Sequence, residues 1–203
     1  YNALGQRIKK EVNGVATTYL YSGFNLFAEY DHQGNLVKRY IYGPGVDFPV
    51  MLQTSSGNYY YHLDRIHSVI ALSDASGNMV ESYSYSPFGQ PDHLSAVGNS
   101  LMFGGREYDK ETGLYYYRAR YYSPILGRFL SPDPIGYSSG DLNLYTYVFN
   151  DPVNYTDALG LSWYFPGDHY VGKVKGYIEN LRKANRTEQA EELELILNQL
   201  TEY

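Results

Sequence analysis

The sequence contains no cysteine, which excludes structural disulfides, cysteine nucleophiles and zinc sites built from cysteine. It also lacks any run of roughly 18 apolar residues, the length that a membrane-spanning helix needs. Its first residues show no basic stretch followed by an apolar one, as a secretory signal would. Lysine and arginine number 16 against 22 aspartates and glutamates, and no long basic run occurs. We therefore expect no membrane span and no nucleic-acid partner for this segment.

Tyrosine, by contrast, is abundant, with 25 copies against 8 phenylalanines and 1 tryptophan among 203 residues. Its ring is apolar and its hydroxyl is polar, so tyrosine suits strands that are half buried. The composition therefore favours a mostly β fold around a sizeable core. The chain opens inside a repeated motif, at Tyr1-Asn2, and we expect it to be the C-terminal part of a longer polypeptide.

A short turn motif recurs along the first 113 residues. It has the form Asx-x-x-Gly or a close variant, and it occurs at 2–5, 31–34, 74–77 and 109–113. An Asp or Asn side chain can accept backbone N–H groups of its own turn, and Gly provides the positive φ that closes it. Segments such as 36–42 and 80–85 lie between these turns and alternate with the period of a strand. The motif predicts hairpins in a curled antiparallel sheet.

The composition changes after Leu161. Residues 162–168 are rich in aromatic residues, Pro and Gly, as in a linker, and the apolar period then becomes that of a helix. Asn185 and Glu188 resemble a capping box, so we expect two amphipathic helices with a break near 184–187. We predict that their apolar faces meet in one cluster formed by Val174, Ile178, Leu193, Ile196, Leu197 and Leu200. The tail is too short for a typical enzyme domain.

Three residues could suggest a metal site: His62, Asp64 and His67. Spacings of two and three residues on a strand and turn do not place them on one face, and no further ligand is marked. We expect ordinary turn hydrogen bonds here, with no metal and no cofactor.

A long stretch with specific motifs follows, between residues 118 and 161. It contains Arg-Ala-Arg-Tyr-Tyr-Ser-Pro at 118–124, Gly-Arg-Phe-Leu-Ser-Pro-Asp-Pro-Ile-Gly at 127–136, Asn-Leu-Tyr-Thr-Tyr-Val at 143–148 and Asp-Ala-Leu-Gly-Leu at 157–161. This stretch closely resembles the junction that ends the conserved core of bacterial Rhs/YD-repeat toxins. Ala158 stands where that family usually has Pro.

The resemblance implies a chemistry for two aspartates. In that family the core is a β-walled shell, and an aspartyl self-cleavage detaches a variable C-terminal cargo. By resemblance the catalytic pair is Asp133 and Asp157, and the cut lies between Leu161 and Ser162. Arg128 matches an arginine of the family pattern and would support the carboxylates, and Gly160 would let the backbone bend toward Asp157. From spacing alone, an Asp-Pro pair favours a turn former.

The domain division that we expect places the Rhs repeat-associated core at 1–161 and a variable tail at 162–203. The implied partners are the remainder of the same polypeptide and a C-terminal cargo or an immunity protein. The implied location is secreted or at the bacterial cell surface. An alternative from another functional class is a non-catalytic YD-repeat surface or scaffold protein whose helical tail binds a partner.

Overall fold

The computed structural model describes residues 1–2, 5–161, 171–183, 185, 187–188, 190–191 and 194. Strands dominate it, as predicted, and they form two antiparallel sheets. Among the described residues, no helix is long and apolar enough to cross a membrane.

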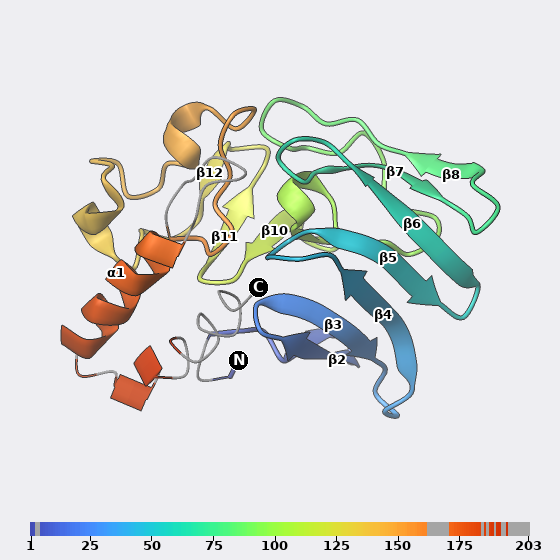
Figure 1. Cartoon of the computed structure of the whole chain (residues 1–203), viewed down its shortest axis with the longest axis horizontal. Helices are drawn as coiled ribbons and strands as arrows, with labels where there is room; N and C mark the ends of the chain where they lie inside the picture. Colours follow the sequence, from blue (N-terminus) through green and yellow to red (C-terminus); the bar gives the residue numbers. More distant parts are fainter. Residues whose placement is uncertain are drawn as a thin grey trace.

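The larger sheet is an eight-stranded meander in which each strand pairs with the next one along the chain. Figure 1 shows these strands following one another along a curved surface, from the N-terminal strands to β8. The strands are β1 (Lys9–Val12), β2 (Val15–Ser22), β3 (Asn25–Tyr30), β4 (Leu36–Tyr42), β5 (Pro49–Thr54), β6 (Gly57–Leu63), β7 (Val69–Ser73) and β8 (Met79–Ser82). The register shifts in five of the seven pairings, which is consistent with the curl of the sheet.

The predicted turns close two of these hairpins. Asp31 Oδ1 accepts the N–H groups of Gln33 and Asn35, and Asp74 Oδ1 accepts those of Ser76 and Asn78. The fourth residue of each turn is a glycine with positive φ, Gly34 in the first and Gly77 in the second. The turn at Asp109 differs, because its carboxylate instead pairs with Arg7 and Lys10.

The smaller sheet has the order β12-β11-β10-β9. Its strands are β9 (Glu107–Asp109), β10 (Leu114–Tyr117), β11 (Arg120–Ser123) and β12 (Arg128–Phe129), and short 3-10 turns occur at η1 (Phe103–Gly105), η2 (Gly136–Ser139) and η3 (Val148–Asn150). Tyr115, Tyr116 and Tyr117 lie on β10 and alternate between its two faces, as predicted. Tyr115 and Tyr117 belong to the main core cluster, whereas Tyr116 packs against Tyr121.

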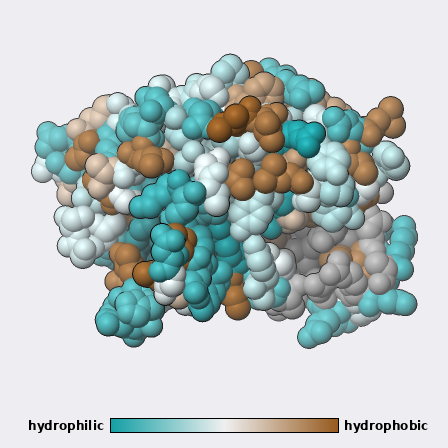
Figure 2. All heavy atoms as spheres, turned by 180° about the vertical axis from the view of Figure 1, so that it is seen from behind, coloured by the Kyte–Doolittle hydropathy of each residue, from teal (hydrophilic) through white to brown (hydrophobic). Residues whose placement is uncertain are grey.

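The hydrophobic core joins the two sheets. The large sheet supplies Tyr40, Leu52 and Leu72, and the small one supplies Tyr115, Tyr117, Tyr122 and Phe129. On the surface seen from behind, apolar residues lie in several groups separated by hydrophilic ones (Figure 2). The fold therefore has its main apolar cluster inside, between a large curled sheet and a small flanking one.

The tail contains the helix α1 (Val171–Lys183), which ends where the sequence predicts a break. The described residues of the second predicted helix, Thr187, Glu188, Ala190, Glu191 and Glu194, are helical. Ile178, Leu181 and Ala190 are buried. Leu193, Ile196, Leu197 and Leu200 lie outside the described residues, as does the side chain of Val174, so their apolar cluster and the domain division at 161 stay predictions.

Candidate active site

Asp133 and Asp157, the two aspartates singled out in the sequence, lie close together in the folded chain. Asp133 follows β12 in the loop that leads to η2, and Asp157 lies in the last turn before Leu161. Only 8% of Asp133 and 2% of Asp157 are exposed. The Oδ2 atoms of both carboxylates contact the Nη2 nitrogen of Arg120, at 3.1 Å and 3.3 Å. One guanidinium nitrogen therefore joins the two carboxylates.

Arg120 is the first residue of β11 and is itself buried. Its Nε donates to the Gly160 carbonyl at 2.6 Å and its Nη1 to the Leu144 carbonyl at 3.2 Å. The guanidinium carbon lies 3.6 Å from the centre of the Phe129 ring. Burial lowers the pKa of Arg120, and the two carboxylates counteract this effect. The cation is thus fixed by contacts with four different parts of the chain.

The proton affinity of Asp133 is shifted by its surroundings. Burial raises the pKa of this carboxyl to about 6, against the opposing effects of the Arg120 guanidinium and the Ile135 N–H, and Asp157 adds to the rise. The Ile135 N–H donates to Asp133 Oδ1 at 3.0 Å. A carboxyl with this pKa is protonated in mildly acidic solution, which is what a general acid requires.

Asp157 is held by a turn of the same type as the hairpin turns. Its Oδ1 accepts the N–H of Leu159 at 3.2 Å and that of Leu161 at 3.1 Å, two and four residues on, as in the Asp31 turn. Gly160 closes it with φ +68°. The two turns differ in burial, because Asp31 is on the surface and Asp157 is in the interior.

Gly160 is required by space as well as by backbone conformation. A Cβ atom at this position would collide with the carbonyl oxygen of Tyr117, since the turn lies directly on the loop between β10 and β11. Leu161 is buried and its N–H reaches Asp157, so the residue before the expected cut is adjacent to the candidate pair. Ser162 lies outside the described residues.

A cavity of about 20 Å³ borders both carboxylates. A polar cavity larger than roughly 10–15 Å³ can hold one water molecule. The lining includes Val148 and Phe149, whose φ angles are +41° and +54°. Such angles are rare for a β-branched or aromatic residue and cost energy, and strain of this kind concentrates at functional sites. The arrangement can therefore place one water beside two carboxylates and a guanidinium.

Arg128, the arginine expected to support the pair, is placed elsewhere. It is exposed on β12, and its guanidinium stacks 5.0 Å from the centre of the Tyr145 ring. Arg120 contacts the carboxylates instead. Besides the resemblance, one local signal marks the two aspartates, because 133–136 and 157–160 both match the Asx-x-x-Gly turn motif. No local pattern singled out Arg120, whose partners come together only through tertiary packing.

The residues considered for a metal site have other roles. His62 Nε2 hydrogen bonds with Ser73 Oγ at 2.9 Å, and Asp64 Oδ1 accepts the N–H groups of Ile66 and Ser68. His67 takes a positive φ of 65°, where the other turns have Gly. No group of three or more possible ligands occurs in the part of the chain that the structure describes.

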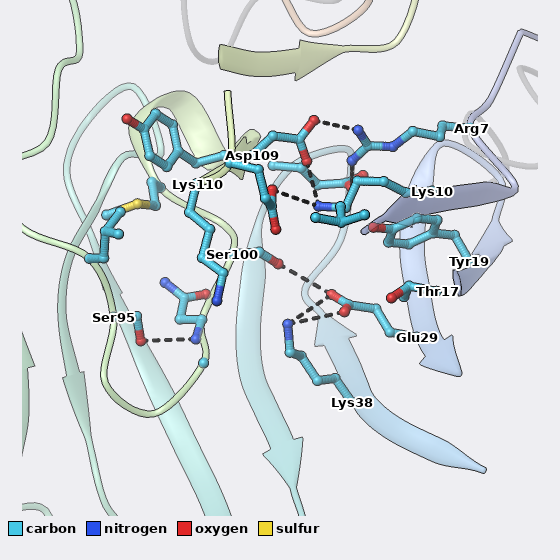
Figure 3. Close-up of a pocket in the computed structure, with 18 of the residues that line it drawn as sticks. Arg7, Lys10, Thr17, Tyr19, Glu29, Lys38, Ser95, Ser100, Asp109 and Lys110 are labelled. Atoms are coloured by element: carbon cyan, nitrogen blue, oxygen red, sulfur yellow. Dashed lines mark hydrogen bonds and ion pairs between the residues drawn. The ribbon is translucent and has the colours of Figure 1, made fainter. Parts of the chain in front are cut away.

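A much larger cavity, of about 630 Å³, lies between the inner face of β1–β4 and the turn after β9. Figure 3 shows that its charged side chains point toward one another: Lys10 toward Asp109, and Lys38 toward Glu29. Ion pairs neutralise most of the charged side chains that line the cavity, so its wall is polar. Its lining also holds two carboxylates on one cation, because Glu107 and Asp109 both pair with Arg7, and burial raises the pKa of Glu107. The smaller site is the better candidate for the expected cut because Asp157 accepts the N–H of Leu161 there.

Comparison with known proteins agrees with this architecture. Residues 1–153 match the Teneurin YD-shell family. The tRNA(Glu)-specific nuclease WapA of Bacillus subtilis subsp. natto is 41% identical over 169 residues, which are 79% of this chain and 7% of WapA. Double-stranded DNA deaminase toxin A of Burkholderia cenocepacia is 26% identical over 196 residues, covering 80% of this chain and 14% of that protein.

A solved structure with the same fold is that of the Photorhabdus luminescens Tc holotoxin pore carrying a TccC3 mutation. It superimposes with a TM-score of 0.61 and 25% identity, over 80% of this chain and 9% of that one. The present chain thus spans a small part of each of these relatives. The curled sheet, the repeated aspartate turns and the family match over three quarters of the residues show that the chain belongs to the Rhs/YD-repeat shell family and is related to its toxin-type members.

Proposed function

We propose that this segment is the C-terminal part of a toxin-type YD shell that cuts its own backbone once, between Leu161 and Ser162, by an aspartyl mechanism. The observation that carries the proposal is the pair of buried carboxylates on one Arg120 nitrogen, beside a cavity of the size of one water. The cut would release the C-terminal cargo from the shell.

The roles of the two aspartates follow from their environments. Asp133, with the raised pKa, carries a proton and donates it to the carbonyl oxygen of Leu161. Asp157, ionised, takes a proton from water as the water oxygen attacks the carbonyl carbon. The C–N bond then breaks: the Ser162 nitrogen takes the proton that Asp157 received, and one hydroxyl of the intermediate returns a proton to Asp133 as the C=O bond re-forms. The products are the new carboxyl of Leu161 and the new amine of Ser162.

Arg120 would keep the two carboxyls in one geometry. Two neighbouring acids resist joint ionisation, and a cation that touches both limits that repulsion without removing it. Because the reacting bond belongs to the same chain, the reaction proceeds in cis and its rate does not depend on protein concentration.

The wider setting is part of the same proposal. The remaining shell would come from the upstream part of the polypeptide, and the cargo would follow Ser162, with an immunity protein as a further partner. The location would be secreted or at the bacterial cell surface. These assignments are supported by the relatives, in which the matched region is a small part of a larger nuclease or toxin polypeptide.

Intact mass under denaturing conditions tests the cut. The 203-residue chain should yield pieces of 161 and 42 residues. Fragments that end at Ala158 or Gly160 would contradict the assigned bond. A chain that stays whole at acidic and neutral pH, with a folded core, would contradict self-cleavage altogether.

The residue roles need matched variants. Asp133→Asn and Asp157→Asn should each abolish cleavage almost as fully as the double variant, because the two carboxyls act as a unit. Asp74→Asn is the control, because Asp74 makes the same type of turn on the surface, where its carboxylate accepts the N–H groups of Ser76 and Asn78. Its cleavage rate should equal that of the unchanged chain.

One observation favours the alternative of a non-catalytic scaffold. Asp157 Oδ1 accepts the same two turn N–H groups as Asp31 Oδ1 and Asp74 Oδ1, which lie in turns that close hairpins. In that case the aspartate pair is a buried ion cluster that fixes the end of the shell. Intact mass separates the two functions directly, since a scaffold yields one polypeptide.

A further inference from the structure

A second group of arginines holds the turn that carries Asp157. The carbonyl oxygen of Ala158 accepts from Arg106 Nη1 at 2.8 Å and also from Arg118 Nη1. Both guanidinium groups are buried, with side chains 6% and 7% exposed. Through this carbonyl, both arginines act on the backbone of the turn that carries Asp157.

The same two arginines share one carboxylate, that of Asp47. Arg106 Nη2 and Arg118 Nη2 each lie 2.7 Å from Asp47 Oδ1. Two guanidinium groups this close to each other repel unless an anion lies between them, and in a buried site this repulsion is weakly screened. Asp47 therefore allows both arginines to reach the Ala158 carbonyl at once.

Asp47 is distant from the Asp157 turn in the sequence and lies in the loop between β4 and β5 of the large sheet. Its N–H donates to Asn25 Oδ1 at 3.0 Å, and Arg118 Nη2 donates to the Phe24 carbonyl at 2.7 Å. The turn that carries Asp157 is thus connected to two hairpin loops of the large sheet through a single ionic cluster.

We propose that Arg106 and Arg118 are positioning residues for Asp157, and that Asp47 makes the aspartate pair depend on the docked β4–β5 loop. The effect on cargo release rests on the proposed self-cleavage, whereas the positioning of the Asp157 turn by the arginines does not. The site would be assembled only when the large sheet has folded against it, so an incompletely folded shell would not release its cargo.

The test uses Asp47→Asn, which keeps the shape of the side chain and removes its charge. The matched control is Glu29→Gln, because Glu29 is also buried, lies on β3 of the large sheet, pairs with Lys38 and does not touch the turn. Amide hydrogen exchange is measured by NMR on full-length chains that also carry Asp133→Asn, so that the backbone stays intact in every sample.

Asp47→Asn should speed exchange of the Leu159 and Leu161 amides by at least about tenfold, while the Tyr116 and Tyr122 amides of the small sheet keep their protection. Glu29→Gln should leave all four unchanged. Equal protection of Leu159 and Leu161 in the two variants would overturn the proposal. This readout needs no cleavage, so it remains decisive if the unchanged chain proves not to cut itself.

Cleavage gives the second readout, in chains with Asp133 intact. Asp47→Asn should slow self-cleavage by at least about tenfold without moving the midpoint of its pH profile, because the titrating carboxyls are untouched. If Asp47→Asn does not fold, Arg106→Lys takes its place: it keeps the charge beside Asp47 but has one nitrogen for two acceptors. Wild-type cleavage and wild-type exchange in a folded Arg106→Lys chain would refute the positioning role.

Discussion

At the scale of single residues, the candidate site places two buried carboxylates against one guanidinium. Asp133 and Asp157 share one nitrogen of Arg120. If both carboxyls were ionised, the buried group would carry a net negative charge, which a poorly solvated interior disfavours. Burial is the main cause of the raised pKa of Asp133, and the neighbouring Asp157 carboxyl adds to it.

The pKa of Asp133 gives a signed prediction. Its folded value of about 6 exceeds the ordinary value of 3.8, so between these pH values the folded chain holds a proton that the unfolded chain has released. The contribution of Asp133 to stability is therefore present below pH 3.8 and is lost as the pH rises through 6, by about 3 kcal/mol. Asp133→Asn should remove this pH dependence from the free energy of unfolding.

An NMR titration of the side-chain carboxyls checks the same point directly. Asp133 should titrate near pH 6. Asp31 is the internal control, because hydrogen bonds from Asn35 lower the pKa of this exposed carboxyl. A result in which both aspartates titrate together below pH 4 would show that Asp133 is not the proton carrier.

At the scale of structural elements, one turn type serves two environments. The Asp31 and Asp74 turns lie on the surface between strands, and the Asp157 turn lies in the interior against the β10–β11 loop. The two bonds to the aspartate side chain, from the N–H groups two and four residues on, are the same in all three turns. What changes is the surroundings of its glycine and its carboxylate.

Two glycine substitutions separate the backbone effect from the packing effect. Gly34→Ala meets no atom within 4 Å and has only its φ of +84° to overcome, so it should cost about 1–2 kcal/mol. Gly160→Ala has a similar φ and also displaces the Tyr117 carbonyl, so it should cost roughly twice as much or more. Urea unfolding of both variants measures the difference. Equal losses would mean that the 157–161 turn is not packed on this loop.

Local patterns predicted the elements well and the site only in part. The strand 36–42 and the hairpin turns were predictable because alternation and Asx-x-x-Gly involve contacts within a few residues. The pairing of Arg120 with two aspartates was not predictable, because it depends on how β11 packs against two later loops. Arg128 was the nearer arginine to Asp133 in the sequence, but strand geometry points it to Tyr145.

At the scale of the whole molecule, buried tyrosines join the two sheets. Tyr117 and Tyr147 hydrogen bond through their hydroxyls at 2.9 Å, and Tyr61 donates to Asn99 Oδ1 at 2.8 Å. Each buried hydroxyl with a partner avoids the cost of an unsatisfied polar group. The core thus combines aromatic packing with a hydrogen-bond network, and both depend on neutral tyrosine side chains.

This core predicts a cooperative alkaline transition. Burial raises the pKa of Tyr40, Tyr61, Tyr115 and Tyr117 well above the ordinary value of 10.0. The stability that these groups contribute is fully present below pH 10 and is lost as the pH rises beyond it. Solvent-exposed tyrosines in general ionise at about pH 10, and the buried group should ionise later, together with unfolding.

Tyrosinate absorbance and circular dichroism, recorded during one alkaline titration, check this expectation. The second absorbance step should coincide with the loss of tertiary structure. A smooth titration of every tyrosine in a chain that keeps its dichroism would show that the core is open to hydroxide.

The reuse of one turn also bears on how such a site can arise in evolution. An Asx-x-x-Gly hairpin tip is complete within five residues, so duplicating it in a repeat protein brings a correctly held carboxylate with every copy. Two copies become a potential acid–base pair as soon as later segments cover them beside an arginine. In this chain, Asp157 is held by the same two bonds as the hairpin-tip aspartates, and what distinguishes it is burial and a cation shared with Asp133.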